Sequence, residues 1–270
     1  MPRRRLTKAQ KIQHELGDPS KVLVIADPQL RAKVRTDHMS WAAQYANAQR
    51  PGMIMCLGDL FDFPSINRWD RGKVEMEGRR IWKDLKAAKQ GVQLFEDSLE
   101  YKPRKVLLEG NHENRLNRLE SEYHWMNGMM TRSFDEDGIP HHPKKMMRHF
   151  GWEVIPFLVP FRHRGVVYAH YFANPRSGKP IGGTAHNLLN KIGETFVQGH
   201  RQELDIAVRD TPSGRRIRGL IAGAYYQHDE PYAGPQGNNH WRGCVLLTEV
   251  SNGWYNLVEV SIEYLRKRFG

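Results

Sequence analysis

The chain has 270 residues, with 41 lysines and arginines against 30 aspartates and glutamates, so its formal net charge is +11. This length fits one large α/β domain or two small ones, and a hydrophobic content of 39% excludes a wholly disordered chain. Two cysteines, Cys56 and Cys244, are too few for a disulfide scaffold, and their apolar neighbours indicate reduced, buried thiols.

No apolar stretch approaches the roughly 20 residues that span a bilayer. Polar residues also follow the basic start of the chain, where a secretory signal would need an apolar run. We therefore expect a cytoplasmic protein with no membrane partner. The excess positive charge favours a partner or substrate that carries phosphate, with DNA and RNA among the candidates.

Three short apolar runs in the first half predict buried strands that end in loops, at residues 21–26, 53–57 and 105–108. Between the second and third runs, apolar residues recur at spacings of four and three, which predicts an amphipathic helix. These residues are Ile81, Leu85, Ala88, Val92, Phe95 and Leu99. Strands that alternate with helices predict parallel pairing with right-handed crossovers.

The second half has a different pattern. Residues 166–170 and 194–200 predict strands that each deliver a histidine to a loop. Four alternating segments follow, and we expect them to be antiparallel strands that close a second sheet. They are residues 203–209, 215–222, 243–250 and 254–260.

The predicted organisation is a single domain over residues 19–262, flanked by basic tails at 1–18 and 263–270. Residues 114–150 show no clear strand, so we expect a helical insertion or cap there.

Residues with metal-ligating side chains follow the predicted strands. They are Asp27 and Gln29, then Asp59 and Asp62, then Asn111, His112 and Glu113, then His170, and finally His200 and Gln202. In an open α/β sheet the ligand crevice lies at the carboxyl ends of the strands. Carboxylate and amide oxygens suit hard divalent ions, whereas imidazoles favour Mn, Fe or Zn. One central carboxylate between two such clusters suits a dinuclear centre for phosphoryl transfer.

In this order the residues resemble the signature of the calcineurin-like metallophosphoesterase superfamily: Asp-x-His, Gly-Asp, Gly-Asn-His-Glu/Asp, a lone His, and Gly-His-x-His. The resemblance covers roughly residues 21–202. It implies a four-layer α/β/β/α sandwich of two mixed sheets with flanking helices. It also implies two divalent metal ions, with Mn²⁺ preferred and Mg²⁺, Fe²⁺ or Zn²⁺ as alternatives.

The resemblance implies that Asp59 bridges the two ions. Asn111, His170 and His200 would complete the second site, and Asp27 would bind the first ion. Two positions depart from the signature, because Gln29 and Gln202 stand where the superfamily usually has histidine.

The first site would then consist of Asp27, Gln29, Asp59 and Gln202, without an imidazole. We expect it to favour Mn²⁺ or Mg²⁺ and to bind its ion weakly or not at all.

The implied reaction is hydrolysis of a phosphodiester by in-line attack of a metal-bound water or hydroxide. His112 would act as a general acid or stabilise charge on the phosphoryl group, beside the metal-binding Asp27 and Asp59. Arg115 and Arg201 would bind the phosphate together with Asn111.

Alternatives stay open on the sequence alone. The protein could act on nucleic acid or nucleotides as a nuclease-type phosphodiesterase. It could instead be a small-molecule phosphomonoesterase or nucleotide pyrophosphatase, or a catalytically degenerate protein that binds metal or nucleic acid. Asp62 could orient a ligand or cap a helix, and His228 or His240 could replace a missing imidazole. Trp69 could stack on a base or pack in the core, and the oligomeric state is not determined.

Overall fold

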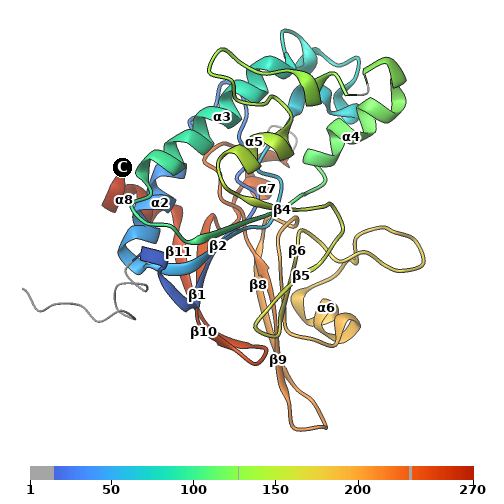
Figure 1. Cartoon of the computed structure of the whole chain (residues 1–270). Helices are drawn as coiled ribbons and strands as arrows, with labels where there is room; N and C mark the ends of the chain where they lie inside the picture. The colour runs from blue at the N-terminus through green and yellow to red at the C-terminus, as the bar shows by residue number, and fades with distance from the viewer. Residues whose placement is uncertain (1–14, 127, 231–232) are drawn as a thin grey trace, which may run out of the picture.

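The computed structural model describes residues 15–126, 128–230 and 233–270 (Figure 1). Two mixed sheets pack face to face, and helices cover their outer faces. This arrangement is the predicted four-layer α/β/β/α sandwich. Among the described residues, no helix is both long enough and apolar enough to cross a membrane.

The first sheet has six strands in the order β11-β10-β1-β2-β3-β4. They are β1 (Asp18–Ile25), β2 (Pro51–Cys56), β3 (Arg104–Leu108), β4 (Glu153–Ile155), β10 (Gly243–Ser251) and β11 (Trp254–Ser261). Strands β1 to β4 run parallel, as the alternation of strands and helices predicts. Strand β10 pairs antiparallel with β1, and β11 pairs antiparallel with β10.

The second sheet has five strands in the order β5-β6-β7-β9-β8. They are β5 (Phe161–His163), β6 (Val166–Ala169), β7 (Phe196–Gln198), β8 (Leu204–Asp210) and β9 (Arg216–Ala222). Strands β6, β7 and β9 are parallel, and the two outer strands are antiparallel to their neighbours.

Side chains alternate between the two faces of each strand, so each sheet contributes to two cores. Val22 and Val24 of β1 point toward the second sheet and pack with Tyr168 and Leu220. Leu23, on the opposite face of β1, packs under the helices. The strands of the first sheet are therefore buried on both sides, which holds the loops at their ends in fixed positions.

Helices α2, α3, α5 and α8 cover the first sheet, and α6 covers the second (Figure 1). The helices are α2 (His38–Gln49), α3 (Ile81–Ser98), α4 (Glu113–Glu122), α5 (Pro143–His149), α6 (Ala185–Ile192), α7 (Gly234–Asn238) and α8 (Ile262–Phe269). The predicted amphipathic helix is α3, which buries Leu85, Ala88, Val92 and Phe95.

The predicted helical insertion holds α4, α5 and two single-turn 3-10 helices, η4 (His124–Met126) and η5 (Met130–Arg132). Phe134 and Pro140 form an isolated β-bridge within it.

One expectation about the sheets is wrong. The segments 203–209 and 215–222 do join the second sheet, but 243–250 and 254–260 belong to the first. There β10 pairs with β1, with Val22 opposite Leu247. Alternation shows which faces of a strand are buried, but it does not identify the neighbouring strand.

The expected basic tail at 263–270 is also wrong, because these residues form most of α8. Ser261 caps the helix by accepting a hydrogen bond from the amide of Tyr264, and Leu265 is fully buried. The basic residues 266–268 occupy the last turn, where positive charge complements the helix dipole. Of the predicted basic segment 1–18, residues 1–14 lie outside the described part of the chain, and β1 begins at Asp18.

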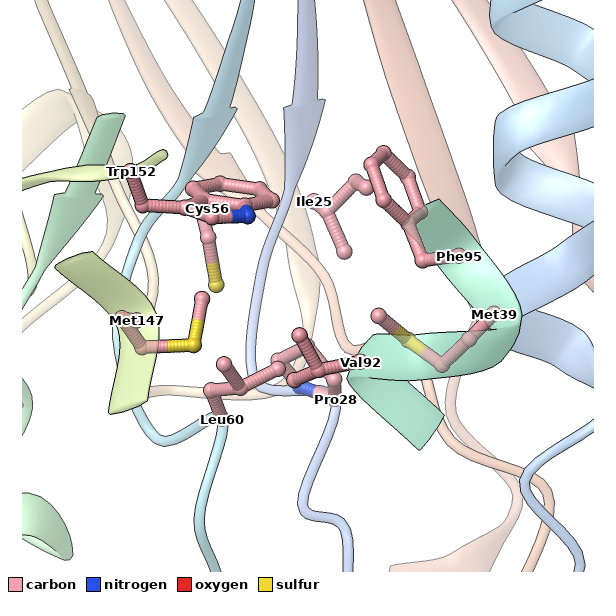
Figure 2. Close-up of a pocket in the computed structure, with 9 residues that line it drawn as sticks. All are labelled: Ile25, Pro28, Met39, Cys56, Leu60, Val92, Phe95, Met147 and Trp152. Atoms are coloured by element: carbon pink, nitrogen blue, oxygen red, sulfur yellow. The ribbon is translucent and has the colours of Figure 1, made fainter. Parts of the chain in front are cut away.

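A small cavity of about 10 Å³ lies between the first sheet and the helices (Figure 2). Every residue around it is apolar, including Cys56, Met147 and Trp152. A space of this size with an apolar lining stays dry, so it belongs to the core and is not a ligand site. Pro28 closes one side, so the core directly supports the loop that carries Asp27 and Gln29.

Candidate metal centre

The ends of both sheets meet at one place, and most of the candidate ligands lie there. Asp27 and Asp59 follow β1 and β2, whereas His170 and His200 follow β6 and β7. Nε2 of His170 is 2.9 Å from Oδ1 of Asn111 and 3.4 Å from Oδ1 of Asp59. The packing of the two sheets therefore brings together residues that follow five different strands.

Asp59, His170 and His200 form a set that could hold a metal ion. One ligand atom from each lies within 4.8 Å of the other two. Nδ1 of His170 donates a hydrogen bond to the carbonyl of Leu57 at 2.8 Å, which leaves Nε2 free to face an ion. The amide oxygen of Asn111 lies against the same nitrogen, so the four residues predicted for the second site lie close together.

The predicted first site has unsatisfied ligand atoms. Oδ1 of Asp27 accepts a hydrogen bond from the amide of His200 at 3.0 Å. Oδ2 of Asp27 and Oε1 of Gln29 are buried, and neither has a hydrogen-bond partner within the described segments. Buried oxygens are nearly always paired in proteins, and a cation would satisfy both. Asp27 and Gln29 therefore fit a divalent ion.

Gln202 is held differently. Its Oε1 accepts a hydrogen bond from the hydroxyl of Tyr226 at 2.9 Å, and this hydroxyl is 3.1 Å from Nε2 of His240. One lone pair of the amide oxygen is therefore already engaged. His240 contacts the hydroxyl of Tyr226, and it does not belong to the set of possible metal ligands around Asp59.

Five predicted ligands have left-handed backbone conformations. The φ angles are +47° at Asp27, +45° at Gln29, +50° at Asp59, +69° at His200 and +63° at Gln202. Each such residue costs of order 1–3 kcal/mol and persists only where its surroundings enforce it. Backbone strain is therefore concentrated in the loops that carry the predicted ligands.

Glu113 enforces the conformation of the Asp59 loop. Its carboxylate accepts hydrogen bonds from the amides of Asp59 (3.0 Å), Phe61 (2.9 Å) and Gly110 (2.7 Å). Burial and the nearby Asp59 carboxylate raise the pKa of Glu113 to about 7. This one side chain joins the loop after β2 to the loop after β3.

Burial and neighbouring charges shift the pKa values of the acidic and histidine side chains at the centre. Burial and the Asp59 carboxylate raise the pKa of Asp27 well above its ordinary value. Burial alone would also raise the pKa of Asp59, but His112 and His170 outweigh it and lower that pKa. Burial and His170 lower the pKa of His200 to about 4, so its imidazole is neutral and able to bind metal.

His112 lies between acidic and basic neighbours. Its Nδ1 is 3.0 Å from Oδ1 of Asp62, and its Nε2 is 2.7 Å from Nη2 of Arg115. Arginine can only donate, so Nε2 accepts this hydrogen bond. Burial lowers the pKa of His112, but Asp59 and Asp62 outweigh it and the pKa rises above its ordinary value.

Asp62 belongs to a second set of possible ligands, with His228 and Glu230. A cation already bridges this set, because Nη1 of Arg31 lies 3.0 Å from Asp62 and 2.8 Å from Glu230. We therefore infer that the acidic groups of this set fix the positions of Arg31 and His112, and that they do not bind a metal ion. His228 lies 2.9 Å from Glu230, so it replaces no imidazole at the Asp59 set.

The two arginines predicted to bind phosphate differ. Arg115 lines a cavity of about 600 Å³ together with His112 and Gln29. Arg201 instead donates to Glu203 at 2.8 Å and to the carbonyl of Gly183 at 2.8 Å. These contacts engage the guanidinium of Arg201 within the protein, whereas its predicted role in phosphate binding stays a prediction.

Comparisons with known proteins find solved structures that resemble this chain at low sequence identity. No family model matches the chain, and no curated protein matches it. A solved structure described as a novel archaeal phosphodiesterase covers 89% of this chain and 99% of its own length, with 9% identity and a TM-score of 0.40. A second solved structure covers 90% and 100%, with 11% identity and a TM-score of 0.40. Similarity this low decides neither the family nor the activity of this chain, which rest on its own residues.

Sequence analysis assigned no role to two residues that shape the centre. Glu113 was named only as the last residue of the Gly-Asn-His-Glu motif, without a role of its own. Arg31 has no motif around it, and its role depends on carboxylates 31 and 199 positions away. Such long-range ion pairs leave no local pattern.

Proposed function

We propose that this protein is a divalent-metal-dependent phosphoesterase that hydrolyses phosphodiester bonds of nucleic acid or nucleotides. The observation that carries the proposal is a pair of buried oxygens, on Asp27 and Gln29, that have no hydrogen-bond partner among the described residues. They accompany the clustered ligand atoms of Asp59, His170 and His200. Buried carboxylates and imidazoles that converge in this way suit cations that bind phosphate.

Asp59, Asn111, His170 and His200 would hold one ion, and Asp27, Gln29 and Asp59 would hold another. Divalent ions, with Mn²⁺ as our first choice, would neutralise charge on the phosphoryl oxygens and activate a water molecule. The proposed first site contains no imidazole. The oxygen of Gln202, its expected fourth ligand, already accepts a hydrogen bond from Tyr226. The affinity of this site for its metal ion should therefore be the lower of the two.

His112 would supply the proton for the leaving oxygen. In the free protein its Nε2 accepts a hydrogen bond from Arg115. A phosphate oxygen that attracts Arg115 would release Nε2, and the raised pKa of His112 favours uptake of a proton there. Arg115 would then stabilise the phosphoryl charge while Asp62 holds the opposite side of the imidazole.

The test uses bis-para-nitrophenyl phosphate with added Mn²⁺. We expect turnover by the wild-type protein and a loss of more than about 100-fold in Asp59→Asn. Asp97→Asn is the matched control, because Asp97 is exposed and contacts only Gln93 among the hydrogen bonds of the described chain. Calorimetric titration with Mn²⁺ should show one tight and one weaker site, and Asp59→Asn should weaken both.

Equal turnover by Asp59→Asn and wild type would contradict the proposal. Metal binding without turnover in Mn²⁺, Mg²⁺, Fe²⁺ or Zn²⁺ would favour the degenerate binding protein. Faster turnover of para-nitrophenyl phosphate than of the diester would favour the small-molecule phosphomonoesterase.

A further inference from the structure

Residues 64–80, between β2 and α3, form one wall beside the metal centre. They carry three short 3-10 helices, η1 (Pro64–Ile66), η2 (Arg68–Asp70) and η3 (Val74–Met76). Trp69, on η2, leaves 70% of its surface exposed, although tryptophan is usually among the more buried residues. The guanidinium of Arg68 lies 4.6 Å from the centre of a Trp69 ring and covers one face of it.

Trp69 lines two cavities, and residues of the candidate metal centre line each of them. The larger, of about 600 Å³, is lined by Trp69 together with Gln29 and His112. The smaller, of about 70 Å³, is lined by Trp69 together with Asn111. Arg115, which we predict to bind the phosphate, lines both cavities.

The larger cavity has a balanced charge. Its lining includes four cationic and four acidic side chains: Arg31, Lys73, Arg79 and Arg115, and Asp62, Asp70, Glu75 and Glu230. Asp70 pairs with Lys73 at 3.2 Å and with Arg79 at 3.5 Å, so much of this charge is already compensated. A cavity of this volume with polar groups and an aromatic wall suits a neutral nucleoside.

The smaller cavity is strongly basic. Arg68, Arg71, Arg115 and Arg118 line it against a single carboxylate, that of Glu122. Glu122 pairs with Arg71 at 3.4 Å. Within the described chain, no carboxylate oxygen lies within 4.0 Å of the guanidinium nitrogens of Arg68 or Arg118. These two arginines are available for phosphate oxygens.

We propose that Trp69 stacks on a nucleobase of a single-stranded nucleic acid. The larger cavity holds the nucleoside next to the scissile phosphate, and Arg68 and Arg118 bind the phosphate that follows on the other side. The base must be unpaired, because only a free ring can lie on the tryptophan. This inference rests on the proposed function for the position of the scissile phosphate.

The test compares two fluorescein-labelled hexanucleotides with identical phosphates, hexathymidylate and an abasic analogue. Binding is measured by anisotropy in EDTA, where metal-dependent hydrolysis cannot occur. Wild-type protein should prefer hexathymidylate, and Trp69→Ala should reduce that preference about 5- to 150-fold, the contribution of one base stacked on an aromatic side chain. Trp69→Phe should restore part of the preference.

Trp125→Ala is the matched control, because Trp125 is 63% exposed and lines neither cavity. A Trp69→Ala variant that keeps the wild-type preference, or a Trp125→Ala variant that loses it equally, would overturn the assignment of Trp69. Arg118→Gln should weaken both oligonucleotides alike and reduce the slope of log affinity against log salt by about 0.7. An unchanged slope would overturn the placement of the phosphate.

The two proposals fail separately. A wild-type protein that binds hexathymidylate through Trp69 but hydrolyses no diester would refute the catalytic proposal alone. A protein that cleaves bis-para-nitrophenyl phosphate but binds both hexanucleotides equally would refute the stacking proposal alone.

Discussion

Gly110 leaves no room for a side chain, and Gly110→Ala tests whether the close contact of two loops fixes the position of Asp59. A Cβ at this position would lie 2.2 Å from Oδ1 of Asp59 and 2.5 Å from its backbone nitrogen. Ordinary contacts begin near 3.4 Å, so the Asp59 carboxylate would have to move by about 1.2 Å. The backbone of Gly110 is not left-handed, so alanine introduces a clash without local backbone strain.

The expected cost has two parts. Overpacking of this kind destabilises a protein by about 1–3 kcal/mol. A displacement of about 1 Å in a catalytic centre can lower activity about 100-fold. Urea denaturation followed by tryptophan fluorescence measures the first effect, and kcat/KM on bis-para-nitrophenyl phosphate with Mn²⁺ measures the second.

Gly182→Ala is the control, because its Cβ would meet no atom within 4 Å and its φ is not positive. We expect this variant to stay within about 0.5 kcal/mol of the wild type in stability and to match it in activity. If Gly110→Ala behaves like Gly182→Ala in both measurements, the tight packing of Gly110 against Asp59 does not determine the geometry of the centre.

Three further predictions follow from individual side chains. Glu113→Gln would turn an NH₂ group toward backbone amides that now donate to the carboxylate, so we expect a loss of about 1–3 kcal/mol in urea denaturation; a smaller loss would show that the three hydrogen bonds matter little. Burial lowers the pKa of His38 to about 4 from an ordinary 6.5, so its contribution to stability is complete above pH 6.5 and is lost as the pH falls toward 4. The stability difference between wild type and His38→Asn should therefore shift against the wild type by up to about 1.4 kcal/mol per pH unit in that window, and a constant difference would refute the assignment. Arg115→Gln should lower kcat/KM at least about tenfold whereas Arg201→Gln should leave it unchanged, and equal losses would contradict the pairing of Arg201 with Glu203.

The sequence predicted that the candidate ligands lie close together, because they follow strands. Asp27, Asp59 and Asn111 come after consecutive parallel strands, whose carboxyl ends must meet at one edge. His170 and His200 could be placed nearby because each also ends a strand. Strand periodicity and chain order were therefore enough to predict that these candidate residues lie near one another, without any knowledge of side-chain orientation.

The sequence failed where the answer depends on a partner far away in the chain. The segment 243–250 could have paired with several strands, and only the apolar faces of the assembled sheets select β1. Arg201 follows a candidate metal ligand, but its orientation depends on Glu203 and on the carbonyl of Gly183. Its proximity to His200 in sequence therefore gave no sign of these two contacts.

The pairing of β1 with β10 also has a consequence for synthesis on the ribosome. Strand β1 is the third strand of six, yet one of its two neighbours is formed by residues 243–251. Until these residues emerge, the nascent chain exposes an unpaired strand edge whose side chains are apolar on both faces, and such edges promote aggregation. The first sheet therefore cannot be completed before β10 emerges, which makes the protein a candidate for chaperone protection during translation and sensitive to premature stops before Ser251.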